Sequence, residues 1–172
     1  HNPKIVKLIS KIININNLTA DQILYAGGIS MMKKRNFLNP HIDNSHDINR
    51  IRWRMLNLLY YVTPKWDIDD GGNLELWING LNNSQKTIVS KFNRLVCFAT
   101  HPHSFHSVSP ILTDKSRRCV SNYYFSSKPY SDKQYFHVTS FRGFPNQKVR
   151  DILFRLDNCA RMSIRKIFKN GF

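Results

Sequence analysis

Between about residue 29 and residue 125, the chain divides into short runs of aromatic and β-branched residues, and this pattern limits its possible folds more than any other feature. Clusters of Pro, Gly and Asn separate the runs, as is typical of all-β sandwiches and barrels. Two of the runs are nearly continuous in apolar residues, which predicts strands buried on both faces. The clearest strand candidates are Arg54–Val62, Asn73–Ile78, Leu95–Thr100 and Cys119–Phe125.

Helical periodicity is strongest at the two ends of the chain. Asn2-Pro3 gives a capped start, after which apolar residues recur at spacings of three and four. The same period returns over Val149–Phe168. Thr19 with Gln22 resembles a capping box and predicts a short helical turn, which the glycine pair at 27 and 28 would end. We expect one domain over residues 1–172, with a β core over about 25–145 and helices at both ends.

The charge balance is strongly positive, with 26 Lys and Arg against 11 Asp and Glu and a formal net charge of +15. Charged residues make up 22% of the chain, close to the roughly 25% of ordinary domains, so the chain is basic mainly because acids are scarce. A positive field favours an anionic partner, and solubility is the simpler alternative. The 41% hydrophobic content indicates a folded protein, and no apolar run approaches the roughly 18 residues of a membrane span.

The three cysteines, Cys97, Cys119 and Cys159, are odd in number and far apart. They form neither a zinc motif nor a disulfide framework, so we expect a reducing, cytoplasmic setting. Cys97 and Cys119 are predicted to be buried small hydrophobes. The chain lacks an initiator Met and a secretory segment at its start, and we expect trimmed termini.

The strongest candidate for chemistry is His41-Ile42-Asp43. In an extended segment residues i and i+2 point to the same face, so the imidazole and the carboxylate can reach one metal ion. Two His and one carboxylate on one face of a metal is the arrangement of non-haem Fe(II) oxygenases, although surface histidines or a zinc site also fit the pattern. The candidates for a third ligand, all after the run Leu95–Thr100, are His101, His103 and His106.

Several motifs in the same order resemble the 2-oxoglutarate and Fe(II)-dependent oxygenase superfamily, and most closely its prolyl 4-hydroxylase-like branch. The resemblance covers roughly residues 25 to 145. It implies a double-stranded β-helix, a cupin-like jelly roll that is mainly β with flanking helices, in which the terminal helices buttress the larger sheet. The motifs are FLNPHIDN at 37–44, RMLNLLYYV at 54–62, GGNLELW at 71–77, NRLVCF at 93–98, SFHSVSP at 104–110 and RRCVSNYYF at 117–125.

The resemblance implies that His41, Asp43 and His106 bind the iron. His106 is preferred among the later histidines because it alone lies in the aromatic-His-x-Val-x-Pro context of the family. His46-Asp47 repeats the residue types but lies beyond the motif, and we expect a surface turn there. Related halogenases replace the carboxylate with a small residue, so the presence of Asp43 favours hydroxylation.

The family also supplies an arginine, at the start of the strand after the second histidine, for the distal carboxylate of 2-oxoglutarate. Arg117 is favoured over Arg118 because the family spacing selects it and because alternation places it beside small residues such as Cys119. A guanidinium binds a carboxylate in a bidentate fork. Tyr61 matches a family position that hydrogen-bonds the same carboxylate, with a core tyrosine as the alternative. Leu74 resembles an apolar wall beside the cosubstrate.

Two further features carry weaker predictions. Asn57 and Leu59 share the face of Tyr61 if their strand is regular, which makes them additional pocket candidates. The segment HVTSFR at 137–142 resembles a bacterial subgroup of the family, and the sequence suggests no physical role for it.

The implied activity is that of a dioxygenase that hydroxylates an unactivated C–H bond while 2-oxoglutarate is decarboxylated to succinate and CO2. Its cofactors would be Fe(II), 2-oxoglutarate and O2, with ascorbate as a candidate reductant. By analogy of fold, the first choice of substrate is a prolyl residue in a peptide or protein. A free amino acid or small metabolite is second, and a methylated nucleic acid, supported only by the net charge, is third. The alternative class is a non-catalytic β-sandwich module that binds an acidic partner. The sequence does not indicate an oligomeric state.

Overall fold

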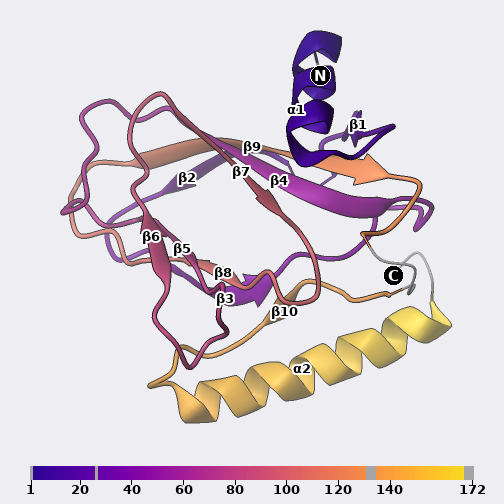
Figure 1. Ribbon diagram of the computed structural model, residues 1–172. Coiled ribbons are helices and arrows are strands. Elements are labelled where there is room, and N and C mark those ends of the chain that lie inside the picture. The colour runs from indigo at the N-terminus through magenta and orange to yellow at the C-terminus, as the bar shows by residue number, and fades with distance from the viewer. Residues whose placement is uncertain (1, 26, 131–134, 169–172) are drawn as a thin grey trace.

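Two antiparallel sheets face each other, with one helix near each end of the chain (Figure 1). The computed structural model describes residues 2–25, 27–130 and 135–168. In chain order the elements are α1 (Pro3–Ile13), β1 (Thr19–Ala20), β2 (Gly28–Met32), β3 (Leu38–Ile42), β4 (Trp53–Tyr61), β5 (Leu74–Leu76), β6 (Lys86–Ile88), β7 (Arg94–Ala99), β8 (His106–Val108), β9 (Arg117–Ser126), β10 (Ser140–Phe141) and α2 (Lys148–Ile167).

The first sheet is built around β9 and β4. Strand β7 pairs with the far side of β4, while β1 and β2 pair with successive stretches of β9. The second sheet has the order β10-β3-β8-β5-β6. This is the double-stranded β-helix implied by the resemblance, so the expectation of a mainly β jelly roll is confirmed. Each of the four predicted strand runs is a strand, namely β4, β5, β7 and β9.

The strands are held by two groups of buried side chains. Between the sheets, Tyr61 and Cys119 pack with Leu74 and Val96. On the outer face of β4, Met55 and its neighbours pack beneath α1. Burial on both faces therefore holds for β4, because one face meets the opposite sheet and the other meets a helix.

The same expectation is wrong for β7. This strand lies at the edge of its sheet and only one of its faces is covered. Val96 is buried, whereas Leu95 is 52% exposed. Cys97 is exposed as well, which contradicts its predicted burial, while Cys119 is buried as expected.

The predicted terminal helices are both present, but they cover different sheets. In α1 the side chain of Asn2 accepts a hydrogen bond from Lys4 N at 2.9 Å, and Ile9 packs on the outside of the first sheet. Helix α2 lies on the other side of the molecule against β10 (Figure 1). Its inner side holds this position through polar contacts, such as the ion pair of Asp151 with Arg142 at 2.6 Å. The expectation that both helices buttress the larger sheet is therefore wrong.

The short helical turn predicted at Thr19 is also wrong. Thr19–Ala20 pairs with β9 instead. The following turn is closed by Asp21, whose carboxylate accepts hydrogen bonds from the backbone N–H groups of Ile23 and Tyr25. A membrane-spanning helix, by length and apolarity, is not found among the residues described above.

Candidate metal centre and cosubstrate pocket

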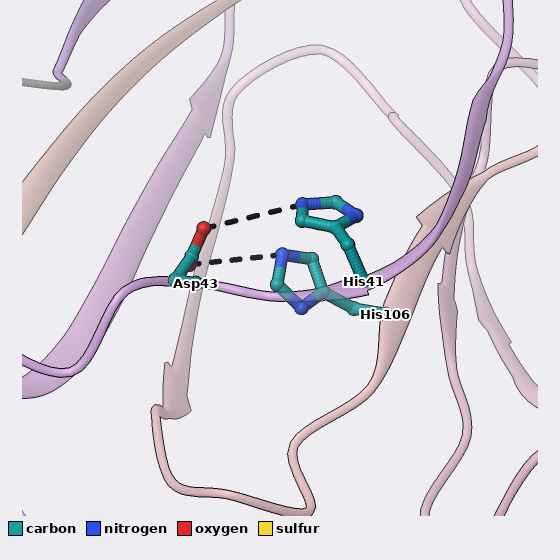
Figure 2. Close-up of side chains that lie close together, drawn as sticks. All are labelled: His41, Asp43 and His106. Carbon is teal, nitrogen blue, oxygen red and sulfur yellow. Dashed lines mark ion pairs between the residues drawn. The ribbon is translucent and has the colours of Figure 1, made fainter. Parts of the chain in front are cut away.

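Strands β3 and β8 bring two histidines together at one end of the sandwich. His41 on β3 lies opposite His106 on β8, and their ring centroids are 4.1 Å apart. Asp43 follows β3 directly and shares the face of His41. Its carboxylate oxygens lie 4.0 Å from Nε2 of His41 and 3.7 Å from Nε2 of His106 (Figure 2). One ligand atom from each of the three buried side chains lies within 4.8 Å of the others.

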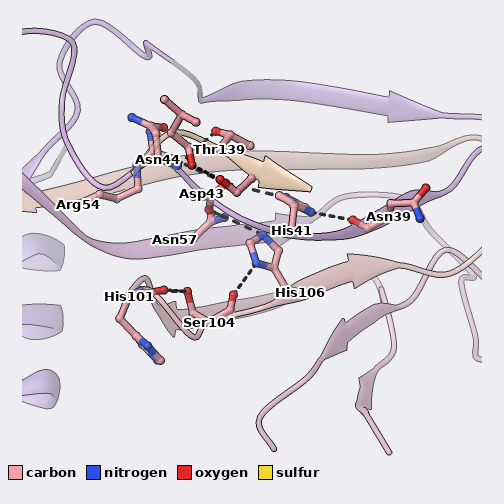
Figure 3. Close-up of polar contacts among 12 residues, drawn as sticks. Asn39, His41, Asp43, Asn44, Arg54, Asn57, His101, Ser104, His106 and Thr139 are labelled. Carbon is pink, nitrogen blue, oxygen red and sulfur yellow. Dashed lines mark hydrogen bonds and ion pairs between the residues drawn. The ribbon is translucent and has the colours of Figure 1, made fainter. Parts of the chain in front are cut away.

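Backbone carbonyl groups orient both imidazoles. Nδ1 of His41 lies 2.9 Å from the carbonyl oxygen of Asn39, and Nδ1 of His106 lies 3.0 Å from that of Ser104 (Figure 3). A ring nitrogen that faces a carbonyl oxygen carries the proton, which leaves the lone pair on Nε2. In its neutral form, each ring therefore presents the Nε2 lone pair toward the carboxylate of Asp43.

The electrostatic environment favours the ligand forms of these groups. Burial, with repulsion from His106, lowers the pKa of His41 to about 4, so this imidazole is neutral at neutral pH. Burial alone would raise the pKa of Asp43, but its neighbours His106 and Arg54 outweigh that effect and keep the pKa below its usual value. A neutral imidazole and an ionised carboxylate need lose no proton to bind a cation.

Two side chains of β4 reach the Asp43 carboxylate. Nδ2 of Asn57 donates to Oδ2 at 3.2 Å, and Nη1 of Arg54 lies 3.8 Å from Oδ1. Arg54 is only 1% exposed, and its guanidinium lies over the ring of Tyr123 at 3.7 Å. Sequence reasoning named Asn57 as a weak candidate and gave Arg54 no role. An arginine that begins an otherwise apolar strand is the signal that could have identified it.

The donor set fits an Fe(II) ion. Two imidazoles and one carboxylate on one side of a site form the two-histidine, one-carboxylate arrangement of non-haem iron proteins, although zinc accepts the same donors. Within the described ranges, these three residues are the group found with metal-binding geometry. His101 and His103 lie apart from it; the ring of His101 points away from Asp43 (Figure 3).

A second buried cluster lies around the first residue of β9. Arg117 is 4% exposed, whereas Arg118 is exposed on the opposite face. Nε of Arg117 donates to Oγ of Ser90 at 3.0 Å, and the guanidinium carbon lies 5.0 Å from the ring centroid of Tyr61. In the part of the chain that the structure describes, no Asp or Glu forms an ion pair with Arg117.

Tyr61 offers a second donor beside this guanidinium. Its side chain is fully buried, and its hydroxyl has no hydrogen-bond partner of good geometry among the described residues, although Arg117 and Ser90 lie next to it. Burial raises the pKa of the hydroxyl, so it stays protonated and able to donate. A buried guanidinium without an acid, next to an unpartnered hydroxyl, fits a carboxylate ligand such as that of 2-oxoglutarate.

The surrounding residues shape this pocket. Leu74, 1% exposed, packs with Tyr61 and Cys119 in the interior cluster. Gly72 has a φ of +60°, and a Cβ there would lie 2.9 Å from Cδ of Arg117. Only glycine combines this backbone conformation with this close approach of the arginine.

The segment 137–142, for which the sequence suggested no role, covers the metal-binding strand. Phe141 on β10 pairs with His41, and its ring stacks on the imidazole at a centroid distance of 5.0 Å. Oγ1 of Thr139 accepts a hydrogen bond from Asn44 N at 3.2 Å (Figure 3). His137 has both ring nitrogens buried without a partner in the described chain. The segment thus closes the outer side of the candidate centre.

The prediction of a surface turn at His46-Asp47 is wrong, because both residues are only 7% exposed. The Asp47 carboxylate accepts hydrogen bonds from Ile51 N and from Nε of Arg52, each at 2.9 Å. These bonds close the loop before β4 from the inside, which explains why this polar pair is buried.

Comparisons with known proteins agree with this geometry. Residues 27–126, more than half of the chain, match the family model of the 2OG-Fe(II) oxygenase superfamily. Prolyl 3-hydroxylase OGFOD1 from Mus musculus is 32% identical over 124 residues, which are 69% of this chain and 23% of that protein. The chain therefore corresponds to only about a quarter of the length of this relative.

Two solved structures share the fold. The viral collagen prolyl hydroxylase vCPH from Paramecium Bursaria Chlorella virus-1, in its 2OG complex, has a TM-score of 0.54 and 13% identity over 73% of this chain and 72% of its own. A prolyl hydroxylase from Trichoplax adhaerens, in complex with a hypoxia inducible factor oxygen degradation domain peptide, has a TM-score of 0.50 and 23% identity over 70% of this chain and 54% of its own. With the family match over residues 27–126, the chain belongs to the 2OG-Fe(II) oxygenase superfamily.

Proposed function

We propose that this chain is an Fe(II)- and 2-oxoglutarate-dependent dioxygenase that hydroxylates a prolyl residue of a peptide or protein. The observation that carries the proposal is the convergence of three buried donors, from His41, Asp43 and His106, within 4.8 Å. The family uses Fe(II), 2-oxoglutarate and O2. Prolyl residues are favoured as the target because the named relatives are prolyl hydroxylases.

In this proposal His41, Asp43 and His106 hold the iron. When bound, the iron supplies the oxidation in which one atom of O2 enters the substrate C–H bond and the other enters succinate, while 2-oxoglutarate loses CO2. The carbonyl groups of Asn39 and Ser104 keep both imidazoles in the tautomer that binds metal. The protein thus provides a ligand set already oriented before the metal arrives.

The remaining polar groups orient the reactants. Arg117 and Tyr61 would bind the distal carboxylate of 2-oxoglutarate, with Leu74 as an apolar wall that excludes water. Asn57 and Arg54 hold the Asp43 carboxylate in place from the β4 side. Each of these roles depends on a side chain that is at most 4% exposed.

The decisive experiment is anaerobic reconstitution with Fe(II), followed by 2-oxoglutarate turnover on a panel of prolyl peptides. We expect the native chain to release succinate and to add one oxygen atom to proline, as read by mass spectrometry. The Asp43→Ala variant should do neither. Equal succinate release from both proteins, or none from the native chain on any peptide, would reject the proposal.

A reducing compartment and a reductant belong to the same proposal. The structure has three free cysteines, two of them exposed, which suits a compartment where thiols stay reduced. Ascorbate would then keep the iron in the Fe(II) state between turnovers. Turnover that decays equally with and without ascorbate would reject this part of the proposal.

A further inference from the structure

A cavity of about 530 Å³ opens beside the candidate metal centre, between the loop after Asp43 and the C-terminal part of α2. Its inner wall includes Asn44, the residue that follows Asp43, and Thr139, which is hydrogen-bonded to Asn44 (Figure 3). Aromatic and aliphatic side chains, among them Phe136 and Ile164, form much of the rest. The cavity therefore combines apolar walls with Asn44, the residue that follows one of the proposed iron ligands in the sequence.

Positive charge predominates among the side chains that line this cavity. The Asp47 carboxylate is already paired with Arg52 at 2.9 Å, and Arg161 is paired with Asp157 at 2.8 Å. The two remaining guanidinium groups form no ion pair with any carboxylate of the described chain. The charged lining residues are Arg50, Arg161, Arg165 and Asp47.

Arg50 and Arg165 lie next to each other, and neither forms an ion pair with a carboxylate of the described residues. Nη2 of Arg50 donates to the backbone carbonyl of Arg165 at 2.8 Å, and its guanidinium lies over the ring of Phe136 at 4.1 Å. Nε of Arg50 is buried and has no hydrogen-bond partner in the described chain. Burial, and then the charge of Arg165, lower the pKa of Arg50. Like charges in a partly buried site repel each other, and a bound anion removes that cost.

We propose that this cavity binds an acidic side chain of the peptide substrate, a few residues away from the hydroxylated proline. An extended peptide advances about 3.3 Å per residue, so the proposal places the acidic side chain a few residues along the peptide from the proline at the metal centre. The apolar walls suit the methylene groups of glutamate, and Arg50 and Arg165 suit its carboxylate. The inference rests on the proposed function, because it assigns the substrate of that same site.

The test is peptide binding, measured by fluorescence anisotropy on the anaerobic protein loaded with Fe(II) and 2-oxoglutarate. Two labelled peptides have one central proline and differ only in flanking residues, glutamates in one and glutamines in the other. We expect the glutamate peptide to bind about tenfold more tightly at low salt, the ratio expected for one charge-assisted hydrogen bond. Raising the salt concentration should reduce this preference.

The variant Arg165→Gln should lose that tenfold preference and leave the affinity for the glutamine peptide unchanged. Arg50→Lys, which retains the charge, should keep most of the preference for the glutamate peptide. The matched control is Lys166→Gln, which removes the same charge from an exposed neighbouring position outside the cavity. Equal affinities for the two peptides, or an equal loss in Lys166→Gln, would overturn the inference.

Failure of this inference is distinguishable from failure of the proposed function. Prolyl hydroxylation without a preference for glutamate rejects the acidic subsite and keeps the dioxygenase. A preference that depends on Arg165, without succinate release on any peptide, supports the subsite and rejects the dioxygenase. A single-stranded RNA that binds through Arg165, when neither peptide does, would also overturn the inference.

Discussion

The metal centre and helix α2 are neighbours, but their polar and apolar side chains differ in opposite ways in their exposure to water. At the centre, polar and charged groups are buried: His41, Asp43 and Arg54 are each at most 7% exposed. On α2, apolar groups are exposed: Leu153 and Leu156 are 61% and 64% exposed. Phe141 connects the two regions, since its ring contacts both His41 and Phe154 of α2.

Burial in these two regions therefore follows the chemistry of each side chain as well as its hydropathy. Each buried charge at the centre lies beside a partner, as Asn57 and Arg54 lie beside Asp43. Helix α2 turns Asp151, Asn158 and Arg161 toward the 139–143 segment, where they are hydrogen-bonded. Its apolar stripe is therefore left on the outside.

Removing the carboxylate from the centre should have the largest effect. We expect Asp43→Ala to weaken Fe(II) binding at least about 100-fold, because the site loses its only anionic ligand. Titration of the metal-free protein with Fe(II) under anaerobic conditions would measure this loss. Asp70→Asn is the matched control, since Asp70 is as buried but is paired with Lys115 away from the centre. A similar loss in both variants would contradict the assignment.

Acid should lower the free energy of unfolding through His137, which lies in the segment that covers the candidate metal centre. Burial lowers the pKa of His137 from 6.5 to about 4. Between these two pH values, the imidazole is protonated in the unfolded chain but stays neutral in the folded chain. The free energy of unfolding should therefore fall as the pH drops from about 6.5 to about 4, by at most roughly 3 kcal/mol from this group. Urea denaturation of the metal-free protein would show it. The fall should shrink in His137→Phe, and an unchanged pH profile in that variant would refute the prediction.

Removing the buried guanidinium of Arg117 should have the next largest effect, a loss of affinity for 2-oxoglutarate. We expect Arg117→Gln to raise the Kd for 2-oxoglutarate roughly 10- to 100-fold, since a charge-assisted hydrogen bond is lost. Anaerobic calorimetry with Fe(II) present would measure it. Arg118→Gln removes the same charge from the exposed face of the same strand and should leave the Kd unchanged. Equal effects of the two variants would assign the interaction to net charge rather than to the pocket.

The smallest effect is expected on the outer face of α2. Leu153→Ala should change the free energy of unfolding by less than about 0.5 kcal/mol, because the side chain is already exposed to water. Leu56→Ala, at a position only 2% exposed, should cost about 2–5 kcal/mol. Urea denaturation compares the two. A large loss in Leu153→Ala would show that something covers the apolar stripe of α2 in solution.

Much of this arrangement could be predicted because it is encoded over short distances in the sequence. The period of two that makes β4 and β9 also places Tyr61 and Arg117 toward the interior. The i, i+2 spacing of His41 and Asp43 is likewise a property of a single strand. In contrast, two of the wrong predictions involved partners far away in the sequence. The exposure of Cys97 depends on the edge position of β7, and the strand at Thr19 depends on pairing with β9.

Local periodicity and ordered motifs were enough to predict the mainly β fold, the terminal helices and the three candidate metal ligands. Three other features depend on long-range packing and could not be read from the sequence. Arg54 lies against Asp43, α2 faces outward with its apolar side, and Arg50 and Arg165 share a cavity. The same holds for the net charge of +15, because only the fold shows which positive groups lie together, as Arg50 and Arg165 do. Charge is counted along the chain, but its effect depends on which groups the fold leaves without a partner.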